Sequence, residues 1–239
     1  MLEVEANESL EAFIRRVVSV ARRDHSLVPG DLADAIRTLC CAEGNPRPTV
    51  YVVECSAWQC ESHVKELRAT FDVDARPWPL TDGEAPPNDG VILSTYFHYN
   101  DVRRAWPRRL KDVHFLEIRL DPDVVISLCE LRESSEGRLR IWVVERDMVT
   151  AETVAADVTA LLPRNGFAVS AREYERPRDA LESLDDGSVA VFAPRVWGVL
   201  TDRDRAHPQS LEARYVFDAK SLADLGCELR WAQLTAASE

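Results

Sequence analysis

Four apolar, β-rich runs in this chain each lead into residues whose side chains could bind or react with a small molecule. The runs cover residues 50–53, 91–94, 141–144 and 189–192. In a parallel sheet the carboxyl ends of the strands share one edge, and ligands bind beyond that edge. If the runs belong to two lobes that face each other, the residues that follow them line one binding cleft. Its candidate residues are Glu54, Cys55, Ser56 and Trp58, then Thr95, Tyr96 and His98, then Glu145 and Arg146, and finally Arg195.

The residue types in this predicted cleft favour a small ligand with an anionic group. Arg146 and Arg195 each offer a planar guanidinium that matches a carboxylate or phosphate. Helices predicted to start after Ser56 and Asp101 would add backbone N–H groups. Trp58, Tyr96 and Tyr99 would form an apolar wall. The alternative is that Ser56 and Thr95 only cap or turn the chain, that the aromatic rings pack locally, and that His98 is a hydrogen-bonded structural residue.

Catalytic and metal-binding patterns are weak in this sequence. Cys55 precedes a predicted helix, where a thiol can become reactive, but two-lobed racemases place a cysteine in each lobe and Arg146 holds the matching position. Cys60 and His63 have no C-x-x-C motif beside them and no obvious fourth zinc ligand. The chain also lacks G-x-S-x-G, G-x-G-x-x-G and P-loop motifs. We therefore expect no catalytic residue, no metal and no cofactor.

The elements that position these residues come in two similar sets. The phrase V-V-E occurs at 52–54 and again at 143–145, each time at the end of an apolar run that leads into a helical pattern. Strands that are apolar on both faces are typical of parallel sheets covered by helices on both sides. The predicted fold is α/β, with two similar, mainly parallel-sheet, Rossmann-like three-layer lobes. A helical hairpin would occupy 1–46, the first lobe 47–135, and the second lobe, with a C-terminal strand and tail, 136–239.

Composition limits the possible function classes. Hydrophobic residues make up 46% and charged residues 29% of the 239 residues, as in ordinary globular proteins. The net charge of -12 argues against nucleic-acid binding by these residues themselves. No apolar run approaches the roughly 20 residues of a membrane span, and the acidic N-terminus has no signal-peptide pattern. We therefore expect a cytoplasmic protein with reduced cysteines and no contact with a membrane.

The order of these parts resembles the effector half of bacterial GntR-type transcription regulators. The resemblance is carried by 10–39 as a helical linker, by V-Y-V-V-E-C-S-A-W-Q-C-E at 50–61, by S-T-Y-F-H-Y-N-D-V at 94–102, and by 214–222. It implies a ligand-sensing and dimerisation module that binds a small-molecule effector. Residues 1–8 are too few for a winged helix-turn-helix, so DNA would be reached only through a missing winged helix. The apolar face formed by Leu10, Phe13, Ile14 and Val17 would pair two protomers in a homodimer or pack on its own lobe.

Two other functions remain open from the sequence. One is an enzyme of the synthase or lyase type, built on two α/β lobes and acting on an acidic small molecule. Its architecture would be similar to that of uroporphyrinogen-III synthase, whose sites depend on shape more than on conspicuous catalytic residues. The other is an interaction domain without a ligand. We expect the sensor rather than the enzyme.

Overall fold

The computed structural model describes residues 10–33, 36, 47–135 and 137–231 and divides into two compact units, residues 1–47 and 48–239. The first unit contains α1 (Leu10–His25), in which Ala21 is buried and Ile14 is half exposed. Residues 29–33 and Ile36 are also helical, and the rest of the second predicted helix lies outside the described residues. Among the helices that can be described, none is long and apolar enough to cross a membrane.

The first lobe of the second unit is built on a four-stranded parallel sheet in the order β2-β1-β3-β4. Its strands are β1 (Thr49–Val53), β2 (Asp74–Pro77), β3 (Val91–Thr95) and β4 (Val113–Leu116). The helices are α3 (Ala57–Thr70) and α4 (Tyr99–Ala105), with short 3-10 turns η1 (Leu80–Asp82), η2 (Tyr96–His98) and η3 (Leu110–Asp112). The parallel strand order confirms the predicted sheet type for this lobe.

The second lobe repeats this topology with the strand order β7-β6-β8-β9, also parallel throughout. Its strands are β6 (Leu139–Glu145), β7 (Phe167–Glu173), β8 (Ser188–Phe192) and β9 (Ser210–Glu212). Its helices are α6 (Met148–Leu161), α7 (Asp179–Glu182), α8 (Pro194–Trp197) and α9 (Asp202–Arg205). The sequence did not predict β9, because three residues with one apolar side chain give no detectable period.

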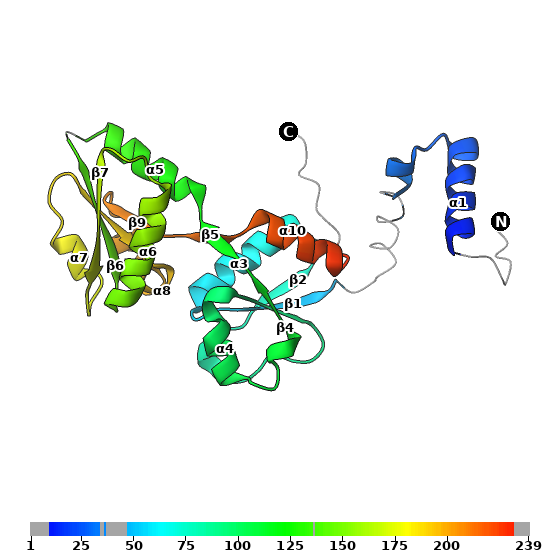
Figure 1. Cartoon of the computed structure of the whole chain (residues 1–239), viewed down its shortest axis with the longest axis horizontal. Helices are drawn as coiled ribbons and strands as arrows, with labels where there is room; N and C mark the ends of the chain where they lie inside the picture. Colours follow the sequence, from blue (N-terminus) through cyan, green and yellow to red (C-terminus); the bar gives the residue numbers. More distant parts are fainter. Residues whose placement is uncertain (1–9, 34–35, 37–46, 136, 232–239) are drawn as a thin grey trace. The chain divides into compact units, whose positions relative to one another are not determined.

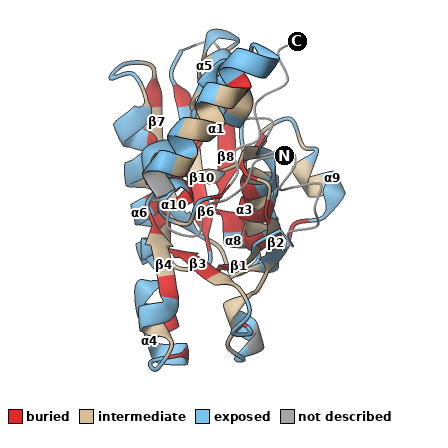
Figure 2. Cartoon of the chain, turned by 90° about the vertical axis from the view of Figure 1, so that its right-hand side faces the viewer, coloured by how far each residue is buried: buried red, intermediate tan, exposed pale blue. Residues whose placement is uncertain are grey.

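Each sheet is covered on both faces, as predicted for a three-layer lobe. In the first lobe, Leu67 and Phe71 pack on one face and Val102 and Trp106 on the other. The second lobe has the same arrangement, with separate core clusters on the two faces of its sheet. Figure 2 shows the strands mostly buried and the outer sides of the helices exposed. This double cover explains why the strands are continuous apolar runs.

The two lobes exchange their last elements. The chain leaves the first lobe through β5 (Ile118–Leu120) into α5 (Pro122–Glu133), and it returns through β10 (Tyr215–Phe217) into α10 (Ala219–Glu228). β5 and β10 pair antiparallel as a two-stranded connection. In Figure 1, α5 lies with the second lobe, and α10 (red) lies beside α3 (cyan) of the first.

The packing of α5 and α10 changes the division of the chain. Leu128 of α5 belongs to the second-lobe core, whereas Leu222 and Leu225 of α10 belong to the first-lobe core. The sequence had placed α5 in the first lobe (47–135) and the C-terminal strand and tail in the second (136–239). Periodicity shows that a helix has an apolar face but not which sheet that face meets. Gly226 of α10 fits against Phe71 so closely that an added Cβ would lie 2.5 Å from the ring.

Candidate functional site

A cavity of about 520 Å³ lies at the carboxyl ends of the strands of both sheets. Both lobes and both connecting strands contribute to its wall, as a cleft between duplicated α/β lobes would require. The first lobe contributes Cys55, Gln59, Tyr96, Phe97, His98, Asp101 and Leu116. The connection contributes Glu117, Ile118 and Tyr215. The second lobe contributes Glu145, Thr150, Thr153, Val154, Asp157, Ala193, Pro194 and Arg195.

On the first-lobe wall, His98 lies between two carboxylates. Its Nε2 is 2.9 Å from Oε2 of Glu54, and its Nδ1 is 3.2 Å from Oδ2 of Asp101. Glu54 and His98 are both buried, and neither carboxylate oxygen of Glu54 has a well-aligned hydrogen-bond donor among the described residues. Burial alone would lower the pKa of His98, but its contacts with Cys55 and Glu54 outweigh burial and raise the pKa from 6.5 to about 11. His98 is therefore an imidazolium at neutral pH.

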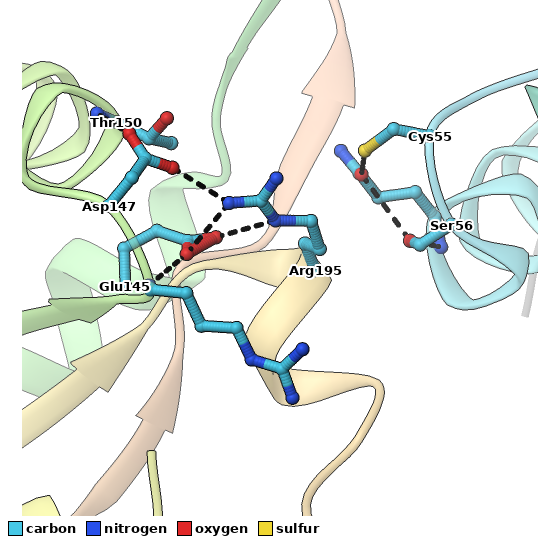
Figure 3. Close-up of polar contacts among 8 residues, drawn as sticks. Cys55, Ser56, Glu145, Asp147, Thr150 and Arg195 are labelled. Carbon is cyan, nitrogen blue, oxygen red and sulfur yellow. Dashed lines mark hydrogen bonds and ion pairs between the residues drawn. The ribbon is translucent and has the colours of Figure 1, made fainter. Parts of the chain in front are cut away.

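On the second-lobe wall, Arg195 is held by two carboxylates in a similar way. Its Nε and Nη2 donate to the two oxygens of Glu145 at 2.9 and 3.0 Å, and Nη2 also donates to Asp147 at 2.8 Å. Glu145 is fully buried and also accepts from the backbone N–H of Arg146. Figure 3 shows Arg195 turned toward Glu145 and Asp147. Hydrogen bonding to Glu145 raises the pKa of Arg195 further above its ordinary value.

These two ion pairs occupy equivalent positions in the two lobes. Glu54 and Glu145 are the glutamates of the repeated V-V-E phrase. His98 lies three residues beyond the end of β3, and Arg195 lies three residues beyond the end of β8. The duplication therefore preserves a buried acid and its cation in each lobe. The two cations differ in chemistry, because the imidazolium of His98 loses its proton as the pH rises through about 11, whereas the guanidinium of Arg195 stays charged.

Cys55 lies at the start of α3 on the first-lobe wall. Its Sγ donates to Oε1 of Gln59 at 3.2 Å, and its side chain also contacts His98. Figure 3 shows Cys55 and Ser56 on the other side of Arg195 from Glu145. Cys55, His98 and Arg195 all line the cavity, so a thiol, an imidazolium and a guanidinium face the same space.

The structure brings together part of the set that the sequence predicted. Cys55, Tyr96, His98, Glu145 and Arg195 line the cavity. The other predicted residues are placed elsewhere. Glu54 is buried beside His98, and Thr95 is also buried. Ser56 caps α3 by accepting from the backbone N–H of Gln59. Arg146 is exposed and is not part of the cavity wall, and Trp58 joins the two lobes.

Trp58 forms a contact between the lobes rather than a wall of the cavity. Its Nε1 donates to Oε1 of Glu212 at 2.6 Å, and the guanidinium of Arg205 lies 4.5 Å from the centre of its ring. Gly198 comes so near that an added Cβ would lie 2.8 Å from the Cβ of Trp58. This contact joins α3 of the first lobe to β9 and the α8–α9 region of the second.

Sequence reasoning missed several residues of the wall, among which Asp157 and Tyr215 are the most informative. Tyr215 donates its hydroxyl to Oδ2 of Asp157 at 2.6 Å, so β10 is tied to α6. In the first lobe, Glu66 of α3 similarly accepts from the backbone N–H of Phe217. Aligning the two V-V-E phrases would have matched Glu66 with Asp157, since both lie 12 residues beyond the glutamate of the phrase.

The weak metal pattern around Cys60 corresponds to core packing. Cys60 is buried, and burial raises the pKa of its thiol to about 12. His63 stacks on Phe217 with a distance of 4.2 Å between ring centres and contacts Glu66 at 3.3 Å. Within the described ranges, no group of three or more histidine, cysteine, aspartate or glutamate residues is arranged to hold a metal ion.

Comparisons with protein-family models, curated proteins and solved structures found no significant match to this chain.

Proposed function

We propose that this protein is the ligand-sensing module of a bacterial transcription regulator resembling the GntR type, and that it binds a small molecule in the cavity between its lobes. The observation that carries the proposal is the composition of the cavity wall. Residues of the first lobe, of the second lobe and of the connecting strands all face the same space. A ligand there contacts both lobes at once.

The connection between the lobes suits a sensor. Among the described residues, β5 and β10 carry the chain from one lobe to the other, and they pair over three residues each. The Trp58–Glu212 hydrogen bond is a further contact between the lobes. A ligand that binds one lobe arrangement better than another shifts the population toward it, and equal affinity for both would shift nothing. The proposed signal is thus a change in lobe arrangement.

The test is ligand binding by a variant in which the cavity is filled. Thr153 of α6 lines the cavity, whereas Thr159 lies on the same helix outside it, and each hydroxyl donates to the carbonyl four residues earlier. Thr153→Trp should abolish the thermal stabilisation that a metabolite hit from a screen gives to the native chain. Thr159→Trp is the matched control and should retain it. Equal stabilisation of both variants would place the ligand elsewhere and contradict the proposal.

Dimerisation through the N-terminal helices is a second part of this proposal. α1 has polar and apolar faces, and its Ile14 is half exposed. Apolar residues on one helical face are suited to pairing with a second copy. Sedimentation equilibrium of the native chain and of Ile14→Glu tests this part. A dimer that the substitution dissociates would support it, and a monomeric native chain would contradict it.

An enzymatic function is the second candidate, and the contact between Cys55 and His98 favours it. Both residues line the cavity, and an imidazolium beside a thiol is a pairing that cysteine-dependent catalysts use. Here the protein would be a two-lobed synthase or lyase acting on an acidic small molecule. Turnover of a bound metabolite that is lost in both Cys55→Ser and His98→Gln would support the enzyme. Binding without turnover would support the sensor.

A further inference from the structure

We infer that the cavity selects a cationic ligand, specifically an ammonium group attached to an apolar body. This inference deepens the proposed function and rests on it, because it assumes that the cavity is the ligand site. It replaces the expectation from sequence that an anionic group would be bound.

The cations on the cavity wall are already neutralised. Arg195 uses Nε and Nη2 on Glu145 and Asp147, and the two bonds to Glu145 form the bidentate arrangement that an anionic ligand would need. His98 lies between Glu54 and Asp101. An anion could therefore bind the Nε and Nη2 edge of Arg195 only by displacing Glu145. Arg146, the other guanidinium that the sequence suggested, is not part of the wall.

Carboxylates outnumber cations around this space. Asp101 has one further cation, Arg104, at 3.7 Å on the exposed side of α4. Asp157 and Glu117 line the cavity, and neither forms an ion pair with any residue that the structure describes. The carboxylates at or beside the wall are Glu54, Asp101, Glu117, Glu145, Asp147 and Asp157, and the cations are His98, Arg104 and Arg195.

Asp157 is the carboxylate best placed to receive an ammonium group. Its partner is the neutral hydroxyl of Tyr215, which donates to Oδ2 at 2.6 Å. Burial, together with the hydrogen bond to Asp157, raises the pKa of Tyr215, so the hydroxyl keeps its proton and remains a donor. This contact fixes the carboxylate without neutralising its charge. Asp157 is exposed, so its charged carboxylate is accessible to a ligand in the cavity.

The aromatic residues of the wall point to a cation with an apolar body. Tyr96 and Phe97 line the cavity, are neighbours in the chain, and are 60% and 58% exposed. Tyr96 is supported from behind by Phe115, at 5.8 Å between ring centres. Exposed aromatic faces attract ammonium groups as well as apolar surface. Leu116, Ile118 and Val154 complete an apolar lining.

The inference is tested with three probes of similar size and different charge, namely 2-phenylethylammonium, 2-phenylethanol and 3-phenylpropionate. Binding to the native chain is measured by isothermal titration calorimetry at low ionic strength. The ammonium probe should bind at least about tenfold more tightly than the carboxylate. Asp157→Asn should weaken ammonium binding about fivefold to tenfold, because the neutral amide keeps the shape and loses the charge. Asp186→Asn, in an exposed turn away from the wall, is the matched control and should leave binding unchanged.

The outcomes separate this inference from the proposed function. Tighter binding of 3-phenylpropionate than of the ammonium probe, or equal binding of all three probes, overturns the cationic ligand class. If Thr153→Trp blocks that binding, the cavity remains the site. The cationic ligand class is also overturned if the ammonium probe does not bind although a metabolite does bind in the cavity, as shown by the loss of its binding in Thr153→Trp. Ammonium binding that neither Asp157→Asn nor Thr153→Trp changes would contradict both the ligand class and the site.

Discussion

Oε2 of Glu54 lies 2.9 Å from Nε2 of His98, and the contact is buried in the first lobe. The second lobe repeats it with Glu145 and Arg195. Isolated buried carboxylates are costly, and a nearby cation reduces that cost. Glu54 therefore holds the loop that follows β3 in the first lobe, and Glu145 holds the loop that follows β8 in the second. The loops held in this way, at His98 and Arg195, form opposite walls of the cavity.

The histidine in this pair should make the stability of the protein depend on pH. The pKa of His98 is 6.5 in the unfolded chain and about 11 in the folded protein. A raised folded pKa gives stability that is fully present below pH 6.5 and is lost as the pH rises through 11. In this window, loss of the proton from His98 should lower the free energy of unfolding by up to about 1.4 kcal/mol for each unit that the pH rises. Urea unfolding at several pH values measures this decline.

The control for the pH prediction is His98→Gln, which cannot gain a proton. Its unfolding free energy should be lower than that of the native chain near neutral pH, because Glu54 is left buried without a cation. Its decline between pH 6.5 and 11 should be correspondingly shallower. An unchanged pH slope in the variant would show that His98 is not the group responsible.

Removing Arg195 should destabilise the second lobe. Breaking a fully buried pair costs roughly 3–5 kcal/mol, but the side chain of Arg195 is 47% exposed, so water reduces the loss. We expect Arg195→Met to cost about 1–3 kcal/mol in chemical denaturation. Adding Glu145→Gln should restore part of the stability, because the unpaired buried charge is then absent. If the double variant is no more stable than Arg195→Met, the pair is not coupled in this way.

The Trp58 contact should hold the two lobes together. Trp58→Phe keeps a ring next to Arg205 but removes the N–H that donates to Glu212. Burial raises the pKa of Glu212, and losing its donor leaves that carboxylate without this hydrogen bond. We expect a loss of about 1–2 kcal/mol and faster amide hydrogen exchange at the start of α3 and in β9. Exchange that accelerates equally throughout both lobes would indicate general destabilisation instead.

Cysteine labelling should distinguish the cavity from the core. Cys55 is partly exposed at the cavity, Cys227 is exposed on α10, and Cys60 is buried with the pKa of its thiol raised to about 12. Iodoacetamide should therefore modify Cys55 and Cys227 in the folded protein, and Cys60 only after unfolding. A cavity ligand should protect Cys55 and leave Cys227 reactive, as followed by peptide mass spectrometry. Protection of Cys227 alone would place the ligand outside the cavity.

The sequence by itself determined the local elements and the edge of the sheet at which to look. Apolar runs such as 50–53 and 141–144 indicate buried parallel strands, because only a strand covered on both faces is apolar at successive positions. Turn and cap residues such as Ser56 fix where the following helices begin. From these two signals the paired lobes and five cavity residues, including Cys55 and His98, could be predicted.

Only the tertiary structure decided how these elements are combined. The apolar faces of α5 and α10 are visible in the sequence, but their exchange between the lobes depends on the β5–β10 pairing of segments about a hundred residues apart. The sequence shows Arg195 as a cation but not that Glu145 and Asp147 already neutralise it. A charge is local, whereas its pairing depends on three-dimensional neighbours. That pairing is why we propose a cationic ligand for a cleft that the sequence predicted to bind an anionic group.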